Sequence, residues 1–256
     1  MFNKFFLVLL ALLFLFSFTC ALKIVSPIEA EVSLDSTVEL GSISPGQSFE
    51  LILFDERFNA IAVEGQFSEW SGKSTFYEKN TGIKINIPKD VSFGTKNLSF
   101  KAFDSTNKNE FQSFNVLIKV EEDLWSVAVP DLKNKTKVNF PAEYNLIFSN
   151  ESIGEQKITL NSNLPVYWVK EQTFLVEPKS VLKDVINVVP KHYGNREFDF
   201  TFNSVYSNET KKLHSELSIE SSIESKYSSP LYGFPFFTPT LFPYFLIESF
   251  LGFFLE

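Results

Sequence analysis

Two stretches of the sequence decide the fold: PGQSFELILFDE at residues 45–56 and PAEYNLIFSNE at residues 141–151. Each begins with a proline and continues with apolar side chains at alternate positions. A period of two residues places those side chains on one face of a β-strand. Both stretches therefore predict a strand with one buried face. Pro141 lies 96 residues after Pro45, and Leu146 lies 95 after Leu51.

Further blocks repeat in the same order at a similar spacing, which indicates a tandem duplication. The alternative is that unrelated β-sandwiches share proline turns and alternating strands. The tryptophan spacing argues against that alternative, because the chain has only three tryptophans and two of them match. The matched blocks are Trp70 and Thr75-Phe76 with Trp168 and Thr173-Phe174, Ile87-Pro88-Lys89 with Val189-Pro190-Lys191, and Gly94 and Phe100 with Gly194 and Phe200.

Strict alternation recurs through both repeats, with turn clusters every ten residues or so. Short alternating strands and a repeat near 100 residues are typical of immunoglobulin-like sandwiches. We therefore expect an all-β protein with two tandem immunoglobulin-like β-sandwiches, at residues 22–123 and 124–222. Alternating sets include Phe49, Leu51 and Leu53; Leu98, Phe100 and Ala102; Tyr144, Leu146 and Phe148; and Phe198, Phe200 and Phe202.

The tryptophans have predicted structural roles. Trp70 and Trp168 lie midway in their repeats, which favours core aromatics between the sheets. The alternative is an exposed side chain that stacks on sugars. Trp125 lies between the repeats and is expected to pack at the domain junction.

The second repeat resembles the NEW-family and FixG-type immunoglobulin-like domains of archaeal and bacterial surface or membrane-associated proteins. The similar segments are Tyr144-Asn-Leu-Ile-Phe-Ser-Asn150, Asn163-Leu-Pro-Val-Tyr-Trp-Val169 and Val188-Val-Pro190. The resemblance covers residues 126–222 and, through the duplication, extends more weakly to 23–123. It implies an accessory surface module, and it implies no catalytic residues.

The N-terminus is typical of a secretory signal peptide at residues 1–21. Lys4 precedes an apolar run that begins at Phe5, and small residues follow at its end. The 14 residues from Phe5 to Phe18 span about 21 Å as a helix, against a hydrocarbon core of about 30 Å. That length favours cleavage after Ala21 over an uncleaved anchor. A lipidated Cys20 is a third interpretation.

Composition excludes several classes of protein. Cleavage after Ala21 removes Cys20, the one cysteine, so the mature chain has no disulfide and no cysteine-based site. The net charge is 23 − 31 = −8. Nucleic-acid binding needs clustered positive charge, so the acidic balance argues against that partner.

Candidate chemistry is sparse, so we expect no enzyme, no cofactor and no metal. His192 lies in a turn, and His214 lies on the polar face of a predicted strand. The acidic pairs Asp55-Glu56 and Glu121-Glu-Asp123 do not converge on one point, since neighbouring strand residues face opposite ways. The sequence contains neither a Gly-x-Ser-x-Gly elbow nor a phosphate-binding glycine loop.

Four Asn-x-Ser/Thr sequons permit glycosylation of an exported chain. Their number matches chance for this composition, so it does not by itself indicate modification. The acceptor residues are Asn97, Asn134, Asn150 and Asn208.

The C-terminal segment 223–256 begins as a polar linker and becomes strongly apolar. Residues 231–255 contain one charge, Glu248, and three prolines at 235, 239 and 243. Interior prolines disfavour a spanning helix, and the proline-free residues 244–255 reach only about 18 Å as a helix. We expect a tail that enters the outer leaflet or docks on a membrane-embedded protein; a distorted spanning anchor and a tail folded onto the sandwiches are the alternatives. The candidate docking residues are Phe234, Phe236, Phe237, Phe242, Phe245, Phe250, Phe253 and Phe254.

These features predict an exported, membrane-associated protein that presents two immunoglobulin-like modules to a protein partner at the outer face of the membrane. One alternative is a carbohydrate-binding surface module with exposed Tyr77, Tyr167 or Tyr206. A weaker alternative is an extracytoplasmic hydrolase, which would place His192 or His214 in a cleft.

Overall fold

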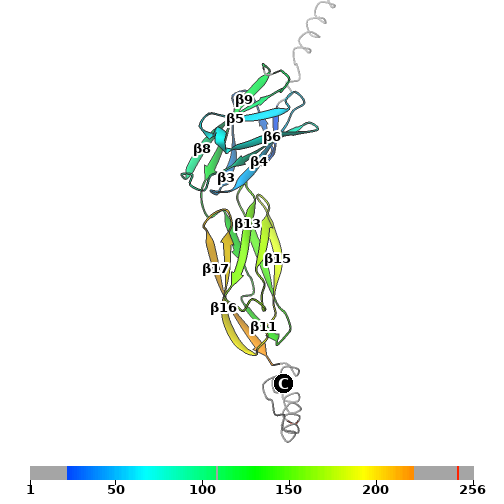
Figure 1. Cartoon of the computed structure of the whole chain (residues 1–256), viewed down its shortest axis with the longest axis vertical. Helices are drawn as coiled ribbons and strands as arrows, with labels where there is room; N and C mark the ends of the chain where they lie inside the picture. Colours follow the sequence, from blue (N-terminus) through cyan, green and yellow to red (C-terminus); the bar gives the residue numbers. More distant parts are fainter. Residues whose placement is uncertain (1–21, 108, 222–246, 248–256) are drawn as a thin grey trace, which may run out of the picture.

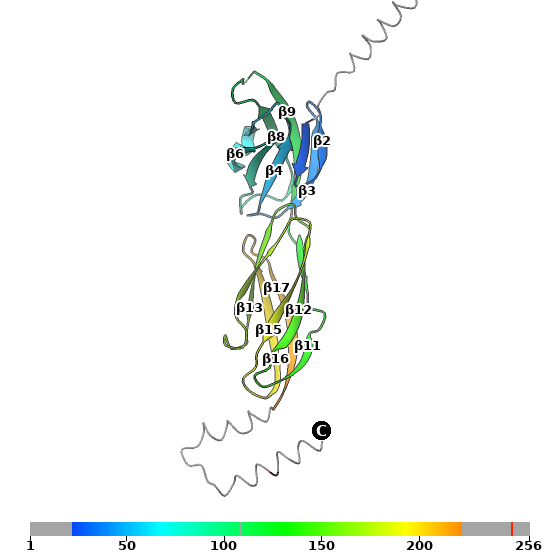
Figure 2. The ribbon, with the colours of Figure 1, turned by 90° about the vertical axis from the view of Figure 1, so that its right-hand side faces the viewer.

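The computed structural model describes residues 22–107, 109–221 and 247. The described chain forms two β-sandwiches placed end to end (Figures 1 and 2). The predicted all-β class and the sandwich architecture are confirmed. The predicted signal peptide and all eight candidate phenylalanines of the tail lie outside the described residues.

The first sandwich consists of a five-stranded sheet, β2-β1-β4-β7-β6, and a four-stranded sheet, β3-β9-β8-β5. A short 3-10 helix, η1 (Gly65–Trp70), joins β5 to β6. The strands are β1 (Leu22–Ser26), β2 (Ala30–Val32), β3 (Thr37–Ile43), β4 (Ser48–Phe54), β5 (Ala60–Glu64), β6 (Ser71–Tyr77), β7 (Asn80–Asn86), β8 (Gly94–Phe103) and β9 (Phe111–Val120).

The second sandwich consists of a three-stranded sheet, β10-β12-β15, and a five-stranded sheet, β11-β17-β16-β13-β14. In each sandwich one early strand pairs in parallel with the last strand, β3 with β9 and β11 with β17. The strands are β10 (Trp125–Ala128), β11 (Lys133–Lys137), β12 (Ala142–Asn150), β13 (Gln156–Ser162), β14 (Gln172–Val176), β15 (Val181–Val188), β16 (Gly194–Ser204) and β17 (Thr210–Glu220).

The alternating sequences form the cores, as predicted. Phe49, Leu51 and Leu53 of β4 are buried. The matching residues of β12, Tyr144, Leu146 and Phe148, are buried as well. Aromatic packing is densest in the second core, where Tyr144 lies edge-on to Phe200 with ring centroids 5.2 Å apart. Burial of these faces stabilises each sandwich, at about 25 cal/mol per Å² of apolar surface removed from water.

The repeated sequence blocks fall in corresponding strands, with one exception. β4 corresponds to β12, β7 to β15 and β8 to β16. β6 and β14 contain the matched Thr-Phe pairs but join different sheets, since β6 pairs with β7 whereas β14 pairs with β13. The two tryptophans differ accordingly. Trp168 is buried in the second core as predicted, whereas Trp70 ends η1 beside Phe67 and packs only partly buried against the first core, so it lies at the edge of that core and not within it.

The two ends of the described chain lie at opposite ends of the molecule (Figures 1 and 2). β4 runs away from the second sandwich, and β1 begins beside its far end, with Lys23 opposite Phe54. We call this the free end. β17 ends at Glu220, at the end of the second sandwich that faces away from the first (Figure 2). We call this the exit end.

Gly94 and Gly194 open β8 and β16 with φ angles of +111° and +114°. Such angles are strained for any residue with a Cβ, but neither position has an atom within 4 Å of an added Cβ. We therefore expect Gly94→Ala and Gly194→Ala each to lower the free energy of unfolding by about 1–3 kcal/mol, purely through backbone strain. Chemical denaturation measures this. Asp90→Ala, at an exposed turn, is the control. If Gly94→Ala and Gly194→Ala had effects as small as that of Asp90→Ala, backbone strain at the two glycines would be contradicted.

Candidate interaction surface

The two histidines proposed for hydrolase chemistry are both exposed and lie in different places. His192 lies in the turn before β16, with its ring centroid 6.4 Å from that of buried Trp168. His214 projects from the outer face of β17, and its side chain is 60% exposed. Neither histidine hydrogen-bonds to a serine, threonine or tyrosine hydroxyl among the contacts of the described residues. This geometry lends no support to the hydrolase interpretation.

His214 belongs to a row of charged side chains across β16 and β17. Its Nδ1 lies 2.9 Å from the Asp199 carboxylate, and its Nε2 lies 4.0 Å from that of Glu197. The hydrogen bond to Asp199 is the main reason that the pKa of His214 is raised, and the charges of Asp199, Glu197 and Glu216 add to it. Lys133 lies 2.9 Å from Glu216 on the neighbouring strand. The row is a solvated charged face.

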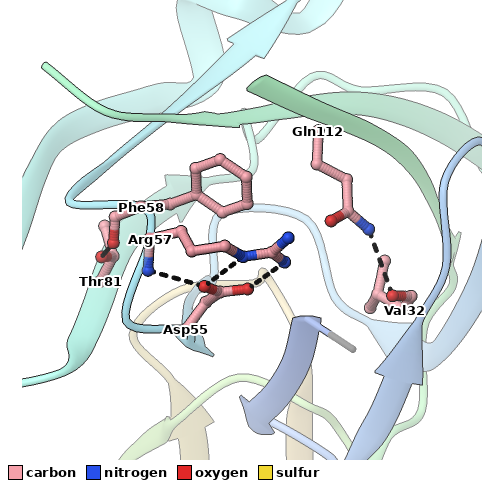
Figure 3. Close-up of polar contacts among 6 residues, drawn as sticks. All are labelled: Val32, Asp55, Arg57, Phe58, Thr81 and Gln112. Atoms are coloured by element: carbon pink, nitrogen blue, oxygen red, sulfur yellow. Dashed lines mark hydrogen bonds and ion pairs between the residues drawn. The ribbon is translucent and has the colours of Figure 1, made fainter. Parts of the chain in front are cut away.

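The acidic pair Asp55-Glu56 divides into two separate contacts. Asp55 is buried and receives hydrogen bonds from Arg57 Nε at 3.0 Å and Nη2 at 2.7 Å, as well as from the Arg57 backbone (Figure 3). Glu56 instead forms an exposed ion pair with Lys79. A buried carboxylate held by a bidentate arginine is a structural clamp, and here it fixes the loop that follows β4.

No cluster of three or more His, Cys, Asp or Glu suited to a metal ion occurs in the part of the chain that the structure describes. The hollows lined by described residues include two open ones. One of about 540 Å³ lies over β11, β16 and β17 and includes Lys133, Glu197 and Glu216. Another, of about 380 Å³, lies beside the contact between the sandwiches and includes Glu155 and Tyr206. Both are shallow and polar, unlike typical small-molecule pockets.

The three tyrosines proposed to stack on sugars are far apart. Tyr77 is 74% exposed at the free end, and Tyr167 is 62% exposed on the loop between β13 and β14. Tyr206 is half-buried near the contact between the sandwiches, with its hydroxyl 3.2 Å from Glu155. Because these rings form no row, the carbohydrate interpretation loses its main support.

The four sequons differ in accessibility. Asn97 and Asn208 are exposed, and Asn134 donates its amide to Glu143 O at 2.7 Å. Asn150 is buried, and its amide nitrogen donates to the carbonyls of Gly154, Val176 and Glu177. Asn150 thus organises the loop after β12, and a glycan on it would break this arrangement.

The contact between the sandwiches, which we call the junction, is centred on buried Gln47. Its Oε1 accepts hydrogen bonds from Ser44 N at 2.9 Å and from Ser152 Oγ at 2.6 Å. Its Nε2 donates to Glu155 O at 3.2 Å and to Gln156 Oε1. Gln156 in turn donates to Ser204 Oγ at 2.8 Å. One side chain of the first sandwich therefore satisfies several polar groups of the second.

An apolar insertion accompanies this network. Ile153, from the loop after β12, is fully buried in the core of the first sandwich, and its N–H donates to Ser42 O at 2.9 Å. Glycines allow the close approach. A Cβ on Gly154 would lie 2.9 Å from Ser48 O, and one on Gly46 would lie 2.4 Å from Tyr206 O. The junction is thus packed like an interior.

A second set of contacts flanks the connecting segment between β9 and β10. Asp123 lies 3.3 Å from Lys211 Nζ, and its N–H donates to Glu209 at 3.1 Å. Lys211 also lies over the ring of buried Trp125, 5.0 Å from its centroid. Trp125 packs in the second core at the end that meets the first sandwich, close to the position predicted for it.

The junction residues were not predicted from the sequence. Gln47 sits in a segment that we interpreted only as a turn and strand start, and Ile153 sits in a loop with polar neighbours. The signals present were Gly46 and Gly154 beside them and an apolar Ile153 in an otherwise polar loop.

No protein family model matches this chain, and no curated protein sequence matches it. Several solved structures align with this chain at low sequence identity. A chimeric titin Z1Z2 is 8% identical over 79% of this chain and 98% of its own, with a TM-score of 0.41. The D0-D1 domain of intimin is 9% identical over 71% and 96%, with a TM-score of 0.27. An endo-fucoidan hydrolase of glycoside hydrolase family 107 is 11% identical over 74% of this chain but only 28% of its own, with a TM-score of 0.35.

Removal of the Gln47 side chain tests the junction. Gln47→Ala removes the acceptor of the Ser152 hydroxyl and the donor to Gln156 Oε1, at about 1–3 kcal/mol for each buried group left unsatisfied. We expect the two sandwiches to unfold in separate calorimetric transitions. The control is Gln112→Ala, since Gln112 makes one hydrogen bond, to Val32 O, within the first sandwich (Figure 3). Equal effects of the two substitutions would contradict a special role for Gln47.

The row on β16 and β17 predicts a pH dependence. Because the pKa of His214 is raised in the folded chain, its contribution to stability is present below the pKa of the unfolded chain and is lost as pH rises through the folded pKa. Titration by NMR measures that pKa. Asp199→Asn should lower it, and Glu197→Gln should lower it less, because Glu197 is farther away. A pKa of His214 that Asp199→Asn leaves unchanged would contradict this assignment.

Proposed function

We propose that the protein is an exported, membrane-associated interaction protein without chemistry of its own. Its two immunoglobulin-like modules form a stiff spacer that presents the first sandwich to a protein partner at the outer face of the membrane. The observation that supports this proposal most strongly is the junction, where Gln47 and Ile153 join the two sandwiches.

The immunoglobulin-like assignment rests on strand order. In the first sandwich, β1, β4, β7 and β6 occupy one sheet while β9, β8 and β5 occupy the other, as strands A, B, E, D and G, F, C do in immunoglobulin domains. The second sandwich has the same order except that β14 lies beside β13. Such sandwiches commonly act as binding or spacer modules, so this order is compatible with the proposal.

Stiffness follows from how the junction is built. Domains joined by a flexible linker normally share few contacts and move relative to each other. Here a buried hydrogen-bond network, an inserted isoleucine and two close-packed glycines cross the boundary. A hinge motion would expose Ile153 and separate the partners of Gln47, so it would cost several buried interactions at once.

The positions of the ends give the spacer a direction. The proposed membrane tail follows the exit end in the sequence, and the free end of the first sandwich lies at the opposite end of the two sandwiches (Figure 2). Phe54 and Tyr77 are exposed at the free end, 40% and 74%, and both lie opposite Asn80 in β7. Exposed aromatic side chains on one sheet face are suited to contact with a protein partner. Among the described residues, no helix is long and apolar enough to cross a membrane.

Removal of the tail tests the proposal. The chain with and without residues 230–256 is expressed in cells, and the membrane and soluble fractions are separated. We expect the whole chain in the membrane fraction and the shortened chain outside it, because the tail supplies most of the apolar surface available to lipid. Cross-linking through a photoreactive group at Tyr77 then identifies the partner. Equal, soluble behaviour of both chains would contradict membrane association.

A further inference from the structure

Two loops surround the point where the chain leaves the second sandwich. They comprise residues 138–141, between β11 and β12, and residues 189–193, between β15 and β16. Val138 N donates to Glu220 O at 3.1 Å, and Gly194 pairs with Ile219 in the sheet. Both loops therefore lie at the exit end, next to the last residues of β17. We call them the tip loops.

The tip loops are fixed to each other. Asn139 N donates to Pro190 O at 2.8 Å, and Lys191 Nζ donates to Asn139 Oδ1 at 3.2 Å. Asn139 adopts a φ of +67°, and the next N–H, of Phe140, donates to Lys137 O at 3.0 Å. These contacts hold the turn in one conformation. The side chains at its surface therefore occupy defined positions.

Each tip loop exposes a large aromatic side chain. Phe140 is 57% exposed and Tyr193 is 71% exposed. Other residues of these loops face the protein. Val138, two residues before Phe140, is buried, and Lys191, two residues before Tyr193, donates a hydrogen bond to Asn139. The side chains of Phe140 and Tyr193 are exposed at the same end of the molecule, so both are available for an external contact.

The charge of the tip loops is opposite to that of the whole chain. The tip loops contain Lys191 and His192 and no acidic residue, and Lys137 directly precedes the first loop at the end of β11, opposite Glu220 in β17, whereas the chain has a net charge of −8. Lys137, Lys191 and His192 are all exposed. Aromatic residues beside lysines are typical of protein surfaces that lie at the boundary between lipid and water. Lysines near such a surface are attracted to anionic headgroups.

We propose that the tip loops rest on an anionic lipid surface, with Phe140 and Tyr193 at the level of the headgroups and Lys137 and Lys191 beside the phosphates. This inference rests on the proposed function, which places the tail in the membrane. Nine residues, 222–230, lie between Ser221 and Leu231, where the apolar segment begins. They span at most about 35 Å, so the tip loops stay close to the surface that holds the tail.

A second contact with lipid matters because a short apolar anchor binds reversibly. Stable attachment generally needs two signals, such as one apolar chain and one basic patch. Here the tail is the first and the tip loops are the second. Two attachment points also fix the orientation of the stiff spacer, which a single attachment point would not.

The position of the tip loops is measured with environment-sensitive fluorophores on single cysteines. The exported chain, from residue 22 onward, contains no cysteine, so Tyr193→Cys and Tyr77→Cys each give one labelling site. Both tyrosines are more than 70% exposed and lie at opposite ends of the molecule. With vesicles of phosphatidylcholine containing 30% phosphatidylglycerol (about one anionic lipid in three), we expect a blue shift for the label at 193 and none at 77.

The outcomes separate this inference from the proposed function. If the chain floats with the vesicles while the label at 193 keeps its aqueous spectrum, the tail binds lipid and the tip loops do not, so this inference is overturned. If neither labelled chain floats with the vesicles, the proposed membrane association fails, and this inference fails with it. A blue shift at both 193 and 77 would also overturn the inference, because it would mean that the molecule lies flat.

A matched pair of charge variants tests the role of the lysines. Lys137→Gln with Lys191→Gln should weaken binding to the anionic vesicles about tenfold and leave binding to pure phosphatidylcholine unchanged. Lys73→Gln with Lys84→Gln removes the same charge from exposed positions of the first sandwich and should have little effect. Equal losses from both pairs would contradict a specific contact at the tip loops.

Discussion

Gln47 is the constraint on which the rest of this structure depends. A glutamine buried between two domains must have partners for both its carbonyl and its amide, since an unsatisfied buried polar group costs about 1–3 kcal/mol. Here the carbonyl accepts from Ser152 and the amide donates to Gln156, both in the second sandwich. When the sandwiches are placed so that Gln47 has its partners, Ile153 also enters the first core. The hydrogen bonds of Gln47 and the apolar packing of Ile153 therefore favour the same arrangement.

This arrangement links the local chemistry to the proposed role. If the two domains are fixed relative to each other, a binding surface at one end of the molecule stays at a set distance from a membrane attached at the other end. The Asp55–Arg57 clamp holds the loop after β4 at the free end, while the contact between Asn139 and Lys191 holds the tip loops at the exit end. Each end is thus ordered independently of the junction, and the junction sets their mutual orientation.

Much of the fold could be predicted from the sequence, because a period of two residues directly reports which side of a strand is buried. The matched residues of β4 and β12, and of β8 and β16, lie in the cores as expected. Other features depend on tertiary contacts that no local pattern reports. Trp70 ends a 3-10 helix and packs only partly buried against the core, and Asn150, which looked like a glycan acceptor, is buried at the end of β12. The pairing of Gln47 with Ser152 joins residues that are 105 positions apart.

The central claim is that the junction makes the two sandwiches one rigid body, and a distance distribution across the junction tests it most directly. Spin labels at the exposed positions Lys84 and Lys183, introduced as Lys84→Cys and Lys183→Cys in the cysteine-free exported chain, place one label on each sandwich. Pulsed electron resonance should then give one narrow distribution, which broadens when Gln47→Ala is added. A distribution that is already broad in the otherwise unaltered chain would contradict the account.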